Sequence, residues 1–361
     1  MADELVLFSQ QGHAGIITLN RPKALNALTF SMVDAISLQL LAWRDDPTIA
    51  TVIIQSGGGR AFCAGGDIAE VVRIMDASGL DAAQQFFRHE YRLNWRIKNY
   101  PKPYVALIDG IVMGGGFGVS AHGHFRVHGA KTMMAMPETA IGFFPDVGGT
   151  YVLSRVPGEL GMFLALTGAR LNGEETVLSG VGTHFSGEQD QAAILTELSQ
   201  IAPGDHAFDA VRATLDRLCP PISTADRNFA GVPARHIDQL FQAGDYAAIQ
   251  AALAADDNEF ANQQLARLNG MSPLSLHVTA RQIRLGATLD FAACLQLEYQ
   301  LVRHFLLDSD FREGVRAMVV DKDRNPQWRD ELVAAVDNRD AMLERFFSPV
   351  VEPLTFDWTG L

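Results

Sequence analysis

Short apolar runs mark β-strands through the first third of the chain. Leu5 to Phe8 and Gly15 to Leu19 are β-rich and lie on either side of a polar turn, which predicts a hairpin. Thr51 to Ile54 is β-branched, and Tyr104 to Ile108 is continuously apolar, as is typical of a buried strand. Phe125 to His128 predicts another short strand. The front of the chain therefore supplies the strands of an α/β fold.

Helical spacing of apolar residues appears between these runs. The segments Ser31 to Trp43 and Asp81 to Asn99 both carry apolar residues three and four positions apart. The apolar stripe of the second segment includes a carboxylate, Glu90. Burial would raise the pKa of this group, whereas a place at the edge of the stripe would let it pair with Arg88 or Arg92. The sequence leaves both interpretations open.

The second half of the chain has a different character. Helical periodicity dominates from about Phe208 onward, and Pro203, Gly204 and Asp205 form a cluster of turn residues just before it. The pattern predicts an α/β unit over residues 1–200 and a helical region over residues 201–361 that packs on it. The expected helices after residue 150 include Tyr151 to Arg155, Glu159 to Leu166, Gly173 to Leu178, Ile237 to Gln242, Tyr246 to Ala254, Leu274 to Leu285, Phe291 to Leu307 and Trp328 to Val336.

Two glycine-rich segments each follow a predicted strand and open a predicted helix. They are Gly65 with Gly66, and Gly114 to Gly116. Glycine lets a ligand approach the backbone closely, and the start of a helix offers N–H groups that lack an acceptor within the helix. Two N–H groups from two such places could converge on one oxygen atom.

Two carboxylates follow the second glycine segment. Glu138 and Asp146 each lie beside a proline, and Gly142 between them prevents both from sharing one helix face. A loop must fold for both side chains to reach one site. Alternatively, Glu138 is an acid near a helix start and Asp146 a turn residue. Backbone donors with two carboxylates can stabilise an oxyanion while a proton moves.

Composition narrows the class of protein. The chain has 361 residues, 48% of them hydrophobic, and a net charge of −13, which argues against nucleic-acid binding. No apolar stretch approaches the ~18 residues of a membrane span, and the acidic N-terminus does not resemble a signal peptide. The three cysteines, Cys63, Cys219 and Cys294, are too far apart for a disulfide framework. We therefore expect a soluble cytoplasmic protein.

Other candidate sites are less well supported. His122, His124 and His128 lie close together, but no carboxylate shares their spacing, so we expect no metal. The glycines do not form GxGxxG, and no acidic residue follows at the distance that a dinucleotide ribose requires. Ser120 lies in GVSAH, which misses the GxSxG pattern of serine hydrolases by one residue.

Longer motifs resemble one known superfamily. The segments ITLNRPKALNAL, AFCAGGDI, DGIVMGGGFGVS, MPETAIGFFPDVGGTYVLSR and LTGARLNGEE are similar to the enoyl-CoA hydratase/isomerase (crotonase) superfamily, in its order and spacing. The Glu90 segment FFRHEYRLN and the later SPLSLHVTARQIR and DFREGVRAMVVDKDRNPQW resemble the hydrolases of 3-hydroxyisobutyryl-CoA within it. The resemblance implies a crotonase-like core built as a ββα spiral, followed by an all-helical C-terminal region.

The same resemblance implies an activity. It is hydrolysis of a short branched 3-hydroxyacyl-CoA thioester to the free acid and CoA, as in valine degradation. Hydratases carry a further glutamate at the position of Gly118, so the two-glutamate addition of water is not expected. The alternatives are another crotonase-fold acyl-CoA enzyme, such as a hydratase or isomerase, and a scaffold without activity. Crotonase-fold proteins often form trimers, but the sequence assigns no oligomeric state.

Site roles follow from the resemblance too. The thioester oxygen would lie between the N–H groups of Gly66 and Gly115, and Glu138 would act as a general base on water or as a nucleophile. Asp146 would orient the substrate or water or transfer a proton, and Glu90 would bind the acyl hydroxyl or tune Glu138. The substrate is expected to bring CoA, with no separate cofactor or metal. The remaining expected substrate contacts are Lys23, Ala24, Leu25 and Ala64 at the CoA nucleotide, with Asp67 and Ile68.

Overall fold

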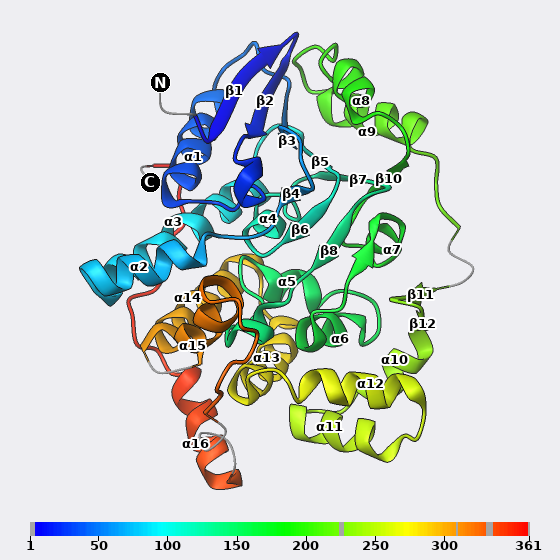
Figure 1. Cartoon of the computed structure of the whole chain (residues 1–361). Helices are drawn as coiled ribbons and strands as arrows, with labels where there is room; N and C mark the ends of the chain where they lie inside the picture. The colour runs from blue at the N-terminus through cyan, green and yellow to red at the C-terminus, as the bar shows by residue number, and fades with distance from the viewer. Residues whose placement is uncertain (1–3, 224–226, 308–309, 330–334, 360–361) are drawn as a thin grey trace.

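The larger of two main sheets runs from the upper edge of the molecule, at β1 and β2, toward its middle (Figure 1). The computed structural model describes residues 4–223, 227–307, 310–329 and 335–359. The sheet order is β1-β2-β3-β5-β7-β10, and every pairing is parallel except the β1–β2 hairpin. The strands are β1 (Val6–Gln11), β2 (Ala14–Leu19), β3 (Thr51–Ser56), β5 (Tyr104–Ile108), β7 (Phe125–Gly129) and β10 (His184–Gly187).

A smaller sheet receives the strand that follows β3, β5 and β7 of the larger one. Its order is β4-β6-β8-β9, with β9 antiparallel to β8. The chain thus passes from β3 to β4, from β5 to β6 and from β7 to β8. This repetition confirms the expected ββα core. The strands are β4 (Ala61–Cys63), β6 (Ile111–Met113), β8 (Met133–Ala135) and β9 (Leu171–Asn172).

Both faces of the larger sheet are covered. Ile53, Val105 and Val127 face a cluster closed by α8 and α9, whereas alternate residues such as Ile54 and Ala106 belong to the main core. Helix α9 lies beyond residue 200 and still covers this sheet, and the division of the chain into two domains there stays a prediction. The helices of this part are α1 (Phe30–Arg44), α2 (Ile68–Ser78), α3 (Leu80–Lys98), α4 (Gly115–Gly118), α5 (Gly149–Leu153), α6 (Leu160–Thr167), α7 (Gly173–Leu178), α8 (Gln191–Leu198) and α9 (Ala207–Leu218), with 3₁₀ turns η1 (Pro22–Ala24) and η2 (Glu138–Ile141).

The C-terminal region is mainly helical, as expected. A short ladder joins β11 (Asn228–Phe229) and β12 (Val232–Pro233), and residues 321–329 and 347–359 form no helix. Figure 1 shows α11 and α12 side by side, away from the sheets, whereas α14 packs against α3. None of the described helices combines the length and apolar character needed to cross a bilayer. The helices are α10 (Ala234–Phe241), α11 (Tyr246–Ala255), α12 (Glu259–Leu268), α13 (Pro273–Gly286), α14 (Phe291–Leu307), α15 (Phe311–Val315) and α16 (Val336–Phe346), with a π-helical turn η3 (Arg316–Val320).

Helices α8, α12 and α15 were not expected from the sequence, and one expected helix is misplaced. Helix α12 was not predicted, because its buried side includes Gln264 and the small Ala261, which weakens the apolar periodicity. The helix expected over Trp328 to Val336 is wrong at Trp328 and Arg329, which have no regular structure, and residues 330–334 lie outside the described part of the chain. The described helix α16 begins only at Val336.

Candidate active site

The two glycine-rich segments meet at one point. Gly65 and Gly66 precede α2, while Gly114, with φ of 44°, precedes α4. The Gly66 nitrogen lies 3.0 Å from the position that a Cβ on Gly115 would take. Within the described residues, neither the Gly66 nor the Gly115 N–H has a hydrogen-bond acceptor. The expected convergence of two helix starts is present, and both N–H groups are free to bind a ligand oxygen.

A cavity of about 190 Å³ is lined by these glycines and by three carboxyl groups. Phe86, Phe87, Ile141, Phe143 and Val147 give most of its wall an apolar character. The carboxyl groups in its lining belong to Glu90, Glu138 and Asp146. A small apolar chamber with a few convergent polar groups is typical of a site for a small acyl group.

Glu138 lies beside the glycine segment at the first position of η2. Its Oε1 is 3.3 Å from the position of a Cβ on Gly114, and its Oε2 has no hydrogen-bond partner within the described chain. The side chain is 6% exposed, and burial raises its pKa well above the ordinary value, with the nearby charge of Asp146 adding to the effect. A buried carboxyl group of this kind is suited to proton transfer.

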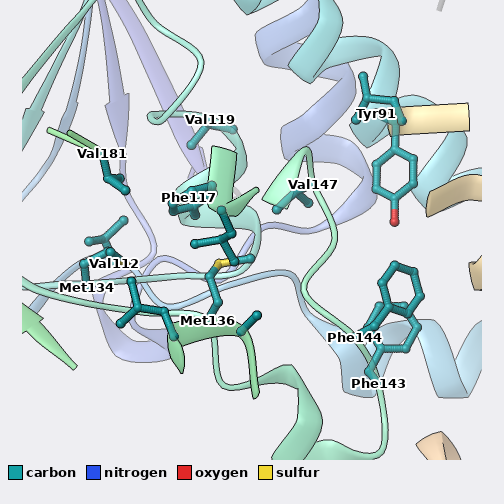
Figure 2. Packing of buried hydrophobic residues seen from close by; sticks show 14 of the residues in the cluster. Tyr91, Val112, Phe117, Val119, Met134, Met136, Phe143, Phe144, Val147 and Val181 are labelled. Atoms are coloured by element: carbon teal, nitrogen blue, oxygen red, sulfur yellow. The ribbon is translucent and has the colours of Figure 1, made fainter. Parts of the chain in front are cut away.

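Asp146 is reached by a loop from Glu138, as the sequence required. Its Oδ2 accepts a hydrogen bond of 2.8 Å from the hydroxyl of Tyr91, on α3. Figure 2 shows this hydroxyl turned toward the segment that carries Phe143 and Phe144. Burial raises the pKa of Asp146 to about 7, against the opposing effect of the Tyr91 hydrogen bond. This carboxyl group therefore exchanges protons near neutral pH.

Glu90 enters the same cavity from α3. Its Oε1 lies 2.6 Å from the position of a Cβ on Gly115 and has no partner within the described chain. Burial, with the charges of Asp146 and Glu298, raises its pKa well above the ordinary value. Arg88 and Arg92 instead donate to Tyr299 and Thr355. The interpretation of Glu90 as an edge residue paired with either arginine is therefore wrong, and the buried one is confirmed.

The expected nucleotide contacts lie on the glycine side of the cavity. Ala64 and Ile68 are in its lining, and the Ala64 N–H donates to the carbonyl of Leu25 at 3.0 Å. Leu25 adopts a left-handed φ of 52° just after the turn that contains Lys23 and Ala24. This turn is therefore held directly beside the site.

Asp67 has a structural role in this region. Its side chain caps α2 by accepting from the Glu70 N–H, and it forms an ion pair of 2.8 Å with Arg21. It does not belong to the cavity lining, unlike its neighbours Gly66 and Ile68. The Arg21 guanidinium is thus engaged by a carboxylate.

The competing sites gain no support. In the described part of the chain, no group of three or more His, Cys, Asp or Glu side chains could hold a metal. His122 donates to the carbonyl of Val147 at 2.6 Å, and burial lowers its pKa to about 3. Ser120 is buried and donates to the Gly116 carbonyl at 2.7 Å. Burial raises the pKa of Cys63 to about 12, as fits a packing residue.

Sequence reasoning missed four polar residues around the Asp146 loop, namely Tyr91, Asn94, Gln282 and Glu298. Glu298 could have been found, because it occupies an apolar stripe of α14, as Glu90 does in α3. Cys294, Leu295, Leu301 and Val302, its neighbours one turn before and after, are all buried. The search for a carboxylate on an apolar helix stripe, which identified Glu90, would also have identified Glu298.

Gly118, the position of the additional hydratase glutamate, has no space for a side chain. A Cβ there would lie 2.8 Å from Nδ2 of Asn94 and 2.9 Å from Cβ of Val147. Asn94 is fully buried, and neither its amide oxygen nor its nitrogen has a partner in the described residues. The volume is therefore filled by neighbours from α3 and from the Asp146 loop.

Comparison with known proteins shows which family and which characterised proteins this chain resembles. Residues 14–347 match the family model described as enoyl-CoA hydratase/isomerase. The mitochondrial 3-hydroxyisobutyryl-CoA hydrolase of Xenopus tropicalis is 46% identical over 346 residues, which is 95% of this chain and 88% of that protein. The human protein of the same name is 44% identical and covers 91% of this chain and 85% of its own length. These names contradict the expected cytoplasmic location, since they point to mitochondria instead.

Solved structures with the same fold carry other names. A carnitinyl-CoA dehydratase from Mycobacterium thermoresistibile is 39% identical, with a TM-score of 0.86, over 98% of this chain and 99% of that one. An enoyl-CoA hydratase from Rhodobacter sphaeroides 2.4.1 is 39% identical, with a TM-score of 0.84, over 98% of this chain and 100% of that one. The names of similar proteins therefore divide between hydrolysis and the addition or removal of water.

Proposed function

The chain belongs to the enoyl-CoA hydratase/isomerase family, and we propose that it hydrolyses 3-hydroxyisobutyryl-CoA to 3-hydroxyisobutyrate and free CoA. This is the reaction in the names of curated relatives that are 41–46% identical over most of the chain. Its place in the chain of reactions that degrades valine is part of the proposal. CoA enters with the substrate, so the reaction requires no separate cofactor.

One observation carries the choice between hydrolysis and hydration. Glu138 lies beside the paired glycine N–H groups, but the position of the other hydratase glutamate is Gly118. The surrounding side chains leave less than 3.0 Å around a Cβ there. A site with one such glutamate lacks the second group of the two-glutamate hydratase route and retains what thioester hydrolysis needs.

The glycine N–H groups take the thioester oxygen in this proposal. As the carbonyl carbon becomes tetrahedral, negative charge grows on its oxygen, and the free N–H groups of Gly66 and Gly115 stabilise that charge. Loss of one such donor typically costs roughly 3–4 kcal/mol of activation free energy. The donors are backbone groups that the fold orients before the substrate arrives.

Glu138 supplies the attack on the thioester carbon. Its carboxylate either takes a proton from water, so that the hydroxide adds to the carbonyl, or adds itself and forms an anhydride that water then cleaves. In both routes the carbon–sulfur bond breaks and the thiolate of CoA leaves and takes up a proton. Glu138 must be ionised to do either, so its raised pKa makes the rate increase with pH.

Asp146 and Glu90 complete the proposed site. Asp146 exchanges protons near neutral pH and lies close enough to influence the ionisation of Glu138, so it is suited to receive or return the transferred proton. Glu90 lies near Gly115, and its Oε1 has no partner within the described chain. This oxygen accepts a hydrogen bond from the hydroxyl of the acyl group. Repulsion between these buried acids makes their titrations interdependent.

Thiol release tests the reaction directly. The purified protein is mixed with 3-hydroxyisobutyryl-CoA, crotonyl-CoA and acetyl-CoA in separate assays, and free CoA thiol is measured. We expect fast release from the first ester alone. Water addition to crotonyl-CoA with an intact thioester, and no thiol release from any ester, would identify a hydratase instead and overturn the proposal.

A further inference from the structure

We infer that Glu298 and Gln282, from two helices of the C-terminal region, are positioning residues that hold Asp146 in the active site. Neither side chain belongs to the cavity lining. They act on the backbone on both sides of Asp146 and not on the reacting atoms. The inference rests on the proposed hydrolase function, because it assigns these residues a role in that reaction.

Glu298 binds the backbone that follows Asp146. Its two carboxylate oxygens accept hydrogen bonds from the N–H of Gly148, at 2.7 Å, and from that of Thr150, at 2.9 Å. The side chain is fully buried on α14, and the structure shows no cation paired with it in the described residues. Two short bonds to N–H groups two residues apart fix both the position and the orientation of this segment.

Gln282 binds a backbone carbonyl before Asp146 and a side-chain hydroxyl after it. Its Nε2 donates to the carbonyl of Pro145 at 2.7 Å and to the hydroxyl of Thr150 at 2.6 Å. The side chain is fully buried on α13. The segment from residue 145 to residue 150 is thus bound at its start by one helix and at its end by two.

The segment needs such support because its conformation is unfavourable by itself. Val147 has a left-handed φ of 51°, which is rare for a β-branched residue, and Gly148 follows with φ of 80°. The His122 ring donates to the Val147 carbonyl from the core side. Without Glu298 and Gln282, the two glycines after Val147 would let the backbone relax and carry the Asp146 carboxyl group away from Tyr91 and Glu138.

A buried carboxyl group loses its hydration, which is unfavourable for a residue that serves only as a structural hydrogen-bond acceptor. Burial raises the pKa of Glu298 to about 8, and its hydrogen bonds with Thr150 and Gly148 oppose this rise. Its two oxygens can accept from two N–H groups at once, whereas an amide offers only one acceptor atom. This requirement explains why a glutamate stands in an otherwise apolar stripe.

The test compares two variants with a control on the same helix. Glu298→Gln keeps the volume but places an NH₂ group against one of the two N–H donors. Gln282→Met removes the donor of the second residue. Gln300→Ala is the control, because Gln300 also lies on α14 and makes three hydrogen bonds, to Val350 and Val351, far from the Asp146 loop.

We expect Glu298→Gln to lower kcat about 100-fold, because misplacing a catalytic group by about 1 Å has an effect of that size. KM should change by less than about twofold, since the oxyanion donors and the CoA contacts are untouched. Gln282→Met should lower kcat by a smaller factor, about tenfold, with KM again preserved. Gln300→Ala should lower the thermal midpoint and leave kcat within about twofold of the wild type.

Hydrogen exchange gives a readout that does not require activity. Peptides that cover residues 143–153 should exchange faster in Glu298→Gln, while the same peptides stay protected in Gln300→Ala. A wild-type kcat in Glu298→Gln, or an equal loss of kcat in Gln300→Ala, would overturn the inference. If the wild-type protein released no thiol, the proposed function would fail first, and exchange would still report whether Glu298 holds the loop.

Discussion

The two walls of the active site differ in the groups they present and in what holds those groups in place. The glycine wall uses backbone N–H groups of Gly66 and Gly115, and neighbouring β-ladders and turns hold it in place. The carboxylate wall uses the side chains of Glu138 and Asp146 on a segment with few regular backbone contacts. That segment is bound by Gln282 and Glu298, which lie 137 and 150 positions away from their partners in the sequence.

This difference shows that the core orients the oxyanion donors, whereas the C-terminal helices position the acidic segment. A ββα core can orient oxyanion donors by itself, because strands and helix starts fix the backbone. An irregular segment with two buried acids needs support from outside that core. The C-terminal region therefore supplies the positioning that makes an acidic, irregular segment usable for chemistry, in addition to covering the core.

Substitution of Glu138 should produce the largest effect in the carboxylate wall. Glu138→Gln removes the group that must carry negative charge, and we expect kcat to fall about 10⁴-fold, the upper range for a proton-transfer group. Binding of the CoA ester, measured by calorimetry, should change little, because the donors in the glycine wall remain. Near-wild-type turnover would remove Glu138 from the mechanism. The exposed Glu344, whose carboxylate pairs with Arg281, is the control for a Glu→Gln change.

Substitution of Gly115 should affect binding and turnover together. The new Cβ of Gly115→Ala would lie 2.6 Å from Oε1 of Glu90 and 3.0 Å from the Gly66 nitrogen, within the proposed place of the thioester oxygen. We expect kcat/KM to fall about 10²–10³-fold, the effect of losing one oxyanion donor. Gly244→Ala is the matched control, because a Cβ there meets nothing within 4 Å. Loss confined to kcat, with binding intact, would argue against this wall as the carbonyl site.

The same contrast decides how much could be predicted from the sequence. Gly66, Gly115 and their helix starts are local patterns, and the structure brings them together as expected. Glu138 and Asp146 were also found, since each stands out beside a proline and glycines. Gln282 and Glu298 were missed, because pairing a helix residue with a loop more than 130 positions away depends on the packing of α13 and α14. Hydrophobic periodicity finds such helices but does not tell which loop each one contacts.

The burial of Asp146 should reduce stability at high pH. Its pKa rises from the ordinary 3.8 to about 7, so the native state binds this proton more tightly than the unfolded state does. The resulting stability is present below about pH 4 and is lost as the pH rises toward 7. Asp146→Asn removes the titration, so the variant should gain roughly 2–4 kcal/mol relative to wild type between pH 4 and pH 8, at about 1.4 kcal/mol per pKa unit.

Urea unfolding of both proteins at several pH values measures this difference. The amide oxygen of the variant can still accept from Tyr91, so the hydrogen bond to the loop is retained. The difference in unfolding free energy between variant and wild type should grow with pH and level off above pH 7. A difference that stays constant from pH 4 to pH 8 would mean that Asp146 keeps an ordinary pKa.

The smallest effect is expected at Gly118, where the two walls touch. Gly118 ends the helix of the glycine wall, and Val147 belongs to the segment of the carboxylate wall. A Cβ in Gly118→Ala would come within 2.9 Å of the Val147 Cβ and 2.8 Å of Nδ2 of Asn94, so one neighbour must move. We expect about 1 kcal/mol of lost stability from overpacking, and a fall in kcat of about threefold to tenfold with KM preserved.

A double-mutant cycle with Val147→Gly tests whether the walls are coupled. Glycine suits the left-handed φ of 51° at this position and removes the Cβ that the new alanine meets. If the loop takes up the strain, the loss of kcat caused by Gly118→Ala should nearly disappear in the Val147→Gly background. The same loss in both backgrounds would show that Asn94 moves instead. The carboxylate wall would then be insensitive to a change in the glycine wall.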